Sequence, residues 1–218
     1  GGYYPSVVNK HSIDVRGIDI LLTHRNQFMA GGKPFIYGIS ASLTYAKSRW
    51  LIYSDEPNAP EIWKLTGKPV GSFLAWTADG LYKSEEEIDN SAWYGTRPNI
   101  GDIKYVDLNN DGVINEEDRT VIGNPNPTWL FSMNNRFEWK GLELSVYLQG
   151  VAGNSIYNAN NIENTGMAAA MNQTVAVLDR WTGEGTSNFM PRAVYGDPNQ
   201  NCRVSDRFVE NGSYLRVK

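Results

Sequence analysis

A twelve-residue stretch, DLNNDGVINEED from Asp107 to Asp118, has the residue types and the spacing of a calcium-binding loop. Side-chain oxygens recur at alternate positions, a glycine at the sixth position suits a sharp turn, and the seventh residue would offer its backbone carbonyl. Calcium takes about six to eight oxygen ligands. The stretch therefore predicts a structural calcium site formed by Asp107, Asn109, Asp111, Val113, Asn115 and Asp118.

The stretch departs from a helix–loop–helix sensor in two ways. Its last position is Asp118 rather than the bidentate glutamate of that motif, and too few residues precede GNPNP for an exiting helix. The alternative is an Asx-rich turn that binds no metal. Repulsion among the carboxylates of Asp107, Asp111 and Asp118 favours a bound cation. The expected role is to stiffen a loop rather than to catalyse a reaction.

Other residue types that could do chemistry do not form a recognisable site. His11 and His24 lack a nearby cysteine or acidic cluster, and Cys202 is the only cysteine. Neither a G-x-S-x-G motif nor a phosphate-binding P-loop occurs. With 20 basic and 24 acidic residues, the net charge of −4 gives no reason to expect a nucleic-acid partner. The sequence therefore predicts a protein that is not an enzyme.

Tryptophans in the long connections are candidate substrate contacts. An indole face can stack on a sugar ring, and the candidates are Trp63, Trp76, Trp93 and Trp181. The alternative is that these residues form small cores, because a long loop must bury apolar surface to stay ordered. For any one of them, burial is the favoured interpretation.

The elements that position these residues are strands, because apolar and polar residues alternate with a period of two. The clearest strands are about ten residues long, and Phe35, Tyr45, Trp129 and Trp139 place aromatic residues at their ends. This pattern is typical of the wall of a transmembrane β-barrel, while a soluble β-sandwich with one buried face is the alternative. The expected strands lie approximately at 13–24, 34–47, 128–139, 142–150 and 213–218.

The connections alternate between short and long, which favours an outer-membrane barrel. Short connections over 25–34 and 140–141 would face the periplasm, and long loops over 48–127 and 151–212 would lie outside the cell. No run of about 18 apolar residues is present, so no transmembrane helix is expected. Because five strands cannot close a barrel, we expect the chain to be a fragment of a longer one.

Two further features belong to the long loops. Short helices are expected at 84–90 and 168–181, where apolar residues recur with helical spacing. Near the last strand, a mixture of charges is expected to form ion pairs among its own members at the mouth of the barrel. Its members are Arg203, Asp206, Arg207 and Glu210.

Several phrases, in this order, resemble the C-terminal barrel region of SusC/RagA-type TonB-dependent outer-membrane transporters of Bacteroidetes. They are GISASLTYAKSRWLIYSDEP, LTGKPVGSFLAWTADGLYKSEEEID, GDIKYVDLNNDGVINEEDRTVIGNPNP, FEWKGLELSVYLQGVAGN and RVSDRFVENGSYLRVK. The resemblance implies that the chain is a segment of a 22-stranded barrel embedded in the lipid of the outer membrane. By the same resemblance, the complete transporter would import glycans or, in some members, peptides. It also implies a SusD-type surface lipoprotein as a lid, and coupling to TonB through an N-terminal part absent here.

A second function class fits the same observations. The chain would be a soluble, calcium-stabilised β module that binds carbohydrate, with the apolar strand faces forming its core. In a transporter those faces, including Phe35, Ile39, Leu43, Phe131 and Phe137, would contact lipid. Whether the apolar strand faces are buried by protein therefore distinguishes the two hypotheses.

Overall fold

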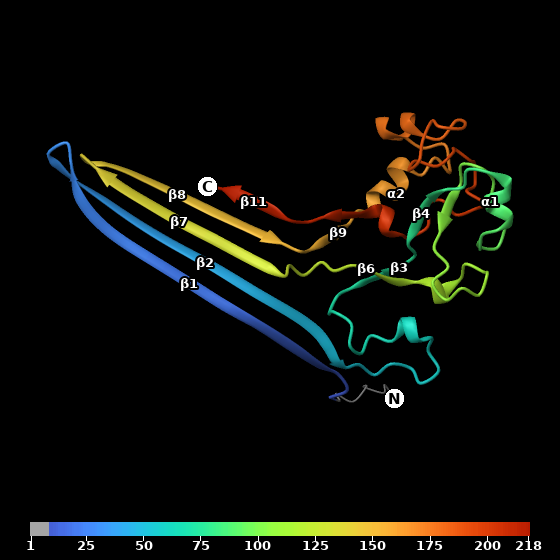
Figure 1. The fold of residues 1–218 in the computed structure, drawn as a ribbon, viewed down its shortest axis with the longest axis horizontal. Coiled ribbons are helices and arrows are strands. Elements are labelled where there is room, and N and C mark those ends of the chain that lie inside the picture. Colours follow the sequence, from blue (N-terminus) through green and yellow to red (C-terminus); the bar gives the residue numbers. More distant parts are fainter. Residues whose placement is uncertain (1–8) are drawn as a thin grey trace, which may run out of the picture.

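The computed structural model describes residues 9–218, which form a long antiparallel sheet with a loop region at one end (Figure 1). The strands of the sheet follow the order β1-β2-β7-β8-β11, and each is antiparallel to its neighbours. Their bounds are β1 Ser12–Ala30, β2 Lys33–Ile52, β7 Trp129–Trp139, β8 Leu142–Ala152 and β11 Tyr214–Val217.

Two-residue turns close both hairpins at the end of the sheet far from the loops. Gly31 and Gly32 have φ values of 55° and 74°, and Lys140 and Gly141 have 51° and 82°. Positive φ at both central residues is the geometry that matches the twist of a tight β-hairpin. The ten-residue connection expected over 25–34 is therefore wrong. β1 continues to Ala30 because Arg25 to Ala30 pair with β2 without interruption.

The register places the apolar residues of adjacent strands on one face. Phe35 pairs with Trp139 and Tyr45 pairs with Trp129, so aromatic residues lie at both ends of the segment over which β2 and β7 pair. Eleven residues at about 3.4 Å each, tilted by about 45°, span a height of about 26 Å, close to the apolar band of an outer-membrane barrel. On β2 this face carries Phe35, Tyr37, Ile39, Ala41, Leu43 and Tyr45.

Beyond this band, β2 projects past the end of β7 as far as Ile52. The exposed edge of the projection pairs with the chain that follows it, since the Trp50 amide donates to the Lys68 carbonyl (3.0 Å) and the Gly67 amide donates to the Trp50 carbonyl (2.8 Å). The extension therefore joins the sheet to the first long loop, which begins later than the expected residue 48.

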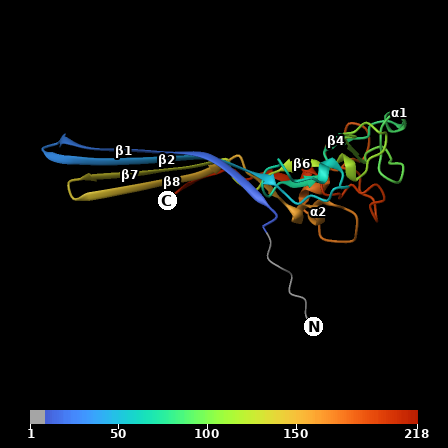
Figure 2. The ribbon, with the colours of Figure 1, turned by 90° about the horizontal axis from the view of Figure 1, so that it is seen from below.

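The loop region lies beyond one end of the sheet (Figure 2). Three short strand pairs and several helical turns organise it. Neither α-helix in the described part of the chain is long and apolar enough to cross a membrane. The strand pairs are β3 Phe73–Ala75 with β6 Thr120–Gly123, β4 Ala78–Leu81 with β5 Ile103–Tyr105, and β9 Ser155–Tyr157 with β10 Val209–Asn211. The helices are α1 Glu85–Asp89 and α2 Ala159–Thr165, and the 3-10 turns are η1 Glu61–Trp63, η2 Glu116–Asp118, η3 Val175–Asp179 and η4 Asp206–Phe208.

Only one of the two expected helices forms as predicted. The Ser84 hydroxyl accepts a hydrogen bond from the Glu87 amide (3.1 Å) and caps α1, as expected of serine at a helix start. The helix expected over 168–181 is wrong, because only η3 forms there. Asn158, whose side chain accepts from the Asn161 amide, instead starts α2 upstream.

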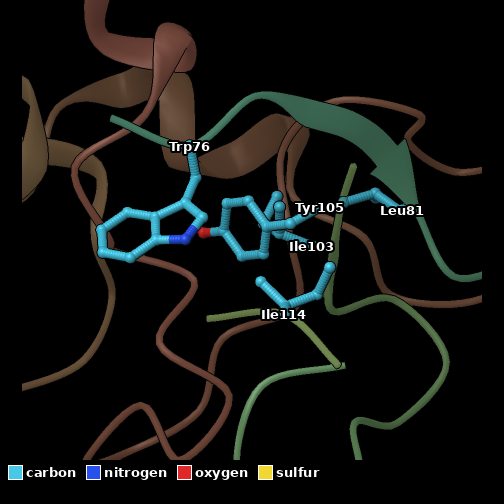
Figure 3. Close-up of a cluster of buried hydrophobic side chains, with 5 residues drawn as sticks. All are labelled: Trp76, Leu81, Ile103, Tyr105 and Ile114. Carbon is cyan, nitrogen blue, oxygen red and sulfur yellow. The ribbon is translucent and has the colours of Figure 1, made fainter. Parts of the chain in front are cut away.

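The buried apolar core lies in the loop region and not against the sheet. Figure 3 shows its central cluster, in which Trp76 and Tyr105 lie beside Leu81, Ile103 and Ile114. Every hydrophobic side chain buried within residues 9–218 belongs to the loops. The apolar face of the sheet therefore has no covering layer in the described part of the chain.

Candidate functional site

In the stretch Asp107–Asp118, side-chain carboxylates accept hydrogen bonds from backbone amides of the same stretch and thereby order the loop. The Asp107 carboxylate accepts hydrogen bonds from the amides of Asn110 (2.7 Å) and Gly112 (2.9 Å). Asn110 and Gly112 have φ values of 59° and 85°, so the turn relies on residue types that tolerate this conformation. Asp111 in turn accepts from the Val113 amide (2.9 Å).

Asp118 closes the loop from inside. Its side chain is fully buried, and its two oxygens accept from the amides of Leu108 (2.9 Å) and Asn115 (2.7 Å). The Asn115 side chain accepts from the Glu117 amide (2.6 Å) and caps η2. Because Asp118 joins the start of the stretch to its end, the loop is a closed unit.

The six predicted ligands all lie in this closed unit, but their carboxylates are engaged with the backbone. The hydrogen bond from the Val113 amide is the main cause that holds the pKa of the exposed Asp111 below its ordinary value. Over residues 9–218, no group of three His, Cys, Asp or Glu side chains is arranged to hold a metal ion. Each carboxylate keeps lone pairs beyond those the backbone uses, so the donor chemistry remains suited to calcium.

Trp76 connects this loop to the buried cluster. Its indole donates to the Asn115 carbonyl (2.8 Å), and the Arg119 guanidinium lies 4.6 Å from its ring centre. Arg203, from the second long loop, lies 4.5 Å from the Trp76 ring and 3.5 Å from the Tyr94 ring. Stacking on aromatic faces compensates a buried guanidinium for part of its lost hydration.

A buried ion pair joins the two long loops. The Asp102 carboxylate, 1% exposed, accepts from Arg192 Nε (2.7 Å) and from the Asn201 side-chain amide (3.1 Å). Asn201 also accepts from the Ile103 amide (2.8 Å). Sequence analysis did not find this junction, because its members are about 90 residues apart and share no local motif.

The four candidate tryptophans lie in different environments. Trp76 is buried within the cluster, and Trp181 packs against the same cluster and over Gly101. Trp93 is partly buried and forms a bridge with Val113. Trp63 is 45% exposed, so of these four its ring is the most open to a ligand. The structure does not bring the four together as one binding surface.

The ion pairs expected among Arg203, Asp206, Arg207 and Glu210 are absent within residues 9–218, and that expectation is wrong. Arg203 stacks on aromatic rings, and Asp206 accepts from the Ala78 amide (2.9 Å). Arg207 donates to backbone carbonyls, and Glu210 accepts from Asn158 (2.7 Å). Arg203 and Asp206 thus contact the first long loop, whereas Arg207 and Glu210 bind partners within the second loop.

Comparison with known proteins shows which sequences resemble this chain. No protein-family model matches the chain. A 154-residue segment, 71% of the chain, is 34% identical to TonB-dependent receptor P26 of Formosa agariphila. The chain belongs to the TonB-dependent receptor family. TonB-dependent receptor P3 of the same organism is 28% identical over 70% of the chain. The matched segment spans 15% of the length of either relative.

Solved structures show the same fold. A structure of the RagAB peptide transporter aligns with 94% of the chain at a TM-score of 0.63 and 19% identity. The RagAB peptide importer in its open-open state aligns with 95% at a TM-score of 0.68 and 17% identity. The chain covers 22% of the matched chain in each case. The five-stranded sheet therefore has the fold of part of a β-barrel wall, and it carries two long loops.

Proposed function

We propose that this chain forms part of the wall and of the external loops of a TonB-dependent transporter in the outer membrane. The apolar face of the sheet is the observation that carries the proposal. Leu22, Ile20 and Leu43 lie in register on this face and remain exposed, while the buried core lies in the loops. A soluble carbohydrate-binding module would bury such a face within itself.

The direction of the sheet supports an assignment of sides. Both tight turns lie at one end, and both long loops lie at the other (Figure 1). Outer-membrane barrels keep short turns on the periplasmic side and long loops outside the cell. We therefore assign Gly31–Gly32 and Lys140–Gly141 to the periplasmic side and the packed loop region to the cell surface.

The cargo in this proposal is a glycan, with a peptide as the alternative. A SusD-type lipoprotein would cover the loop region, and the complete protein would receive energy through TonB. The likeness to a peptide transporter supports nutrient import of this general kind. The resemblance of the sequence phrases to SusC/RagA-type transporters favours the glycan class.

Three measurements test the proposal on the complete protein that carries this chain. It should fractionate with the outer membrane, require detergent for extraction, and support uptake of labelled oligosaccharide only in cells with functional TonB. A monodisperse protein without detergent, with Leu22 and Leu43 buried, would indicate the soluble module instead.

We also propose that the Asp107–Asp118 loop binds calcium as a structural ion. The order of oxygen donors and the closed turn around Gly112 support this assignment. Asp107, Asn109, Asp111, Asn115 and Asp118 would supply side-chain oxygens and Val113 its carbonyl. The ion would neutralise three carboxylates held within one loop and would rigidify it without taking part in transport chemistry.

Calcium titration of the complete protein, followed by calorimetry, tests this assignment. Asp111→Asn should weaken calcium binding, because it removes one exposed carboxylate from the set. Glu56→Gln, an equal charge change in the same long loop, should leave binding unchanged. Absence of binding at millimolar calcium, or equal binding by both variants, would exclude the loop as the site.

A further inference from the structure

A small cleft lies where the two long loops meet. Its volume is about 150 Å³, which accommodates a group no larger than one sugar ring or one side chain. The first loop contributes residues of β4. The second loop contributes Phe189 and the start of η4. The lining residues are Ala78, Gly80, Phe189, Asp206 and Arg207.

Asp206 presents a carboxylate that is only partly used. Its Oδ1 accepts from the Ala78 amide at 2.9 Å, which fixes the side chain at the edge of β4. Within residues 9–218 it forms no salt bridge, and Oδ2 accepts no hydrogen bond from protein. A carboxylate has about four lone-pair sites, so Asp206 retains acceptor capacity in the cleft.

Arg207 presents donors in the same cleft. Its Nη1 donates to the Asn201 carbonyl and its Nη2 to the Phe189 carbonyl, each at 3.2 Å. The guanidinium is also held 5.0 Å from the Phe189 ring centre and 5.5 Å from that of Phe208. A guanidinium has about five N–H donors, so its fixed terminal nitrogens keep donors beyond these two bonds.

Phe189 supplies an apolar surface next to these polar groups. Its side chain is 60% exposed, although it lines the cleft and adjoins the buried Met190. Gly80, with φ of 78°, also lines the cleft and contributes no side chain to it. The cleft therefore combines an accessible aromatic ring, an acceptor and a donor, held by two loops that a buried ion pair joins.

We propose that this cleft binds one sugar ring of a neutral oligosaccharide, an inference that rests on the proposed transport function. Adjacent hydroxyl groups both donate and accept, so one ring would satisfy Asp206 and Arg207 together. The C–H face of the same ring would cover Phe189. A charged group, such as a peptide terminus, would be attracted by one of the two side chains and repelled by the other.

The test measures binding of maltohexaose, cellohexaose and laminarihexaose to the complete protein in detergent, by calorimetry. At least one of the three should bind, and Phe189→Ala should raise its Kd roughly tenfold. Asp206→Asn retains Oδ1 for Ala78 and should also weaken binding. Phe189→Trp should retain binding because it keeps an aromatic face.

Tyr195→Ala is the matched control, because Tyr195 is an aromatic residue of the same loop, is 85% exposed and lies outside the cleft. Its Kd should not change. The proposal is overturned if none of the three sugars binds at millimolar concentration, or if Phe189→Ala and Asp206→Asn bind normally. It is equally overturned if hexa-alanine, and no sugar, shows the dependence on Phe189.

A separate readout distinguishes this inference from the proposed function. If the unaltered protein supports TonB-dependent uptake while the cleft variants transport and bind normally, only the sugar site fails. If the variants lose binding but the unaltered protein supports no uptake, the site stands and the transport function fails.

Discussion

At the scale of single residues, polar side chains act mainly by folding loop backbone. Asp107, Asp111 and Asp118 all accept from backbone amides, and Asp55 does the same for Leu65 (2.7 Å) and Thr66 (3.2 Å). These bonds of Asp107 and Asp111 reach amides two or three residues away, as is usual for Asx turns, whereas those of Asp118 and Asp55 join segments about ten residues apart. The loops are therefore ordered by many local turns in addition to the buried cluster.

The chemistry of Cys202 gives a prediction at this scale. Burial raises the pKa of its thiol to about 12, with the carboxylate of Asp197 adding to the effect. The folded protein should therefore resist iodoacetamide at pH 8, whereas the denatured protein should react, since the thiolate is the nucleophile. Mass spectrometry of the alkylated peptide measures this, and rapid labelling of the folded protein would contradict it.

The same shift has a consequence for stability. The thiol has an ordinary pKa of 9.0, and its folded value is higher. The stability that comes from burying the neutral thiol is therefore fully present below pH 9. It is lost as pH rises from 9 towards 12, because the unfolded chain then gains by losing the proton. Cys202→Ser should reduce this alkaline loss of stability, as measured by thermal unfolding between pH 8 and 10.

Two glycines with positive φ offer a matched test of the loop junction. At Gly101, φ is 87° and an added Cβ would lie 2.4 Å from atoms of the Trp181 ring. At Gly95, φ is 60° and nothing lies within 4 Å of an added Cβ.

Gly101→Ala should separate Trp181 from the cluster and lower the melting temperature, while Gly95→Ala should cost only the backbone strain of about 1–2 kcal/mol. Tryptophan fluorescence during thermal unfolding compares the two variants. Equal destabilisation would mean that contact with Trp181 is unimportant.

At the scale of elements, the strand pattern separates two surfaces of one sheet. Successive residues point to opposite faces, so adjacent leucines on β1 experience different surroundings. Leu22 pairs with Ala41 on the apolar face, and Leu21 pairs with Ser42 on the face that carries the bond between Ser42 and Ser132 (2.7 Å). The two leucines are almost equally exposed, at 68% and 69%.

This pair tests the membrane assignment. Leu22→Arg should destabilise the folded barrel by about 2–4 kcal/mol, because it places a cation against lipid near the middle of the apolar band. Leu21→Arg should be tolerated, because it faces the polar side. Folded protein in the outer membrane is measured from its heat-modifiable mobility on gels. Similar losses for both variants would contradict the assignment of faces.

At the scale of the whole molecule, two loops that are distant in the sequence form one packed region. Asp102 and Arg192 provide its buried ion pair, and Arg119 of the first loop and Arg203 of the second both lie over the Trp76 ring. The cleft at Phe189 and Asp206 exists only because this region is assembled. The loops should therefore open together rather than independently.

Asp102→Ala tests this cooperativity. Removing one partner of a buried ion pair costs about 3–5 kcal/mol, because the other charge is left without compensation. Hydrogen exchange should accelerate in both 75–114 and 190–209.

Asp89→Ala is the control, since its pair with Arg97 is exposed and an exposed pair contributes little to stability. Faster exchange confined to one loop would show that the loops are independent.

The sequence by itself determined the strands of the wall and the family. Alternation of apolar and polar residues along β2, β7 and β8 depends only on the period of a strand, and an apolar face must be covered by lipid or protein. The position of the Lys140–Gly141 turn was also predictable, because the alternation stops there and resumes. Where polar residues interrupted the pattern, as from Arg25 to Gln27, sequence analysis ended β1 too early.

Only the tertiary structure decided how the loops are assembled. The partners of Asp102, Arg203 and Asp206 lie in the other loop or in separate strands, and nothing near them in the sequence specifies those contacts. Arg203 and Asp206 were predicted to form ion pairs because charged residues lie close together in that part of the sequence. In the folded loop region Arg203 instead stacks on aromatic rings, and Asp206 accepts from a backbone amide. Contacts between distant segments depend on how the whole chain excludes water, and that is a property of the assembled fold.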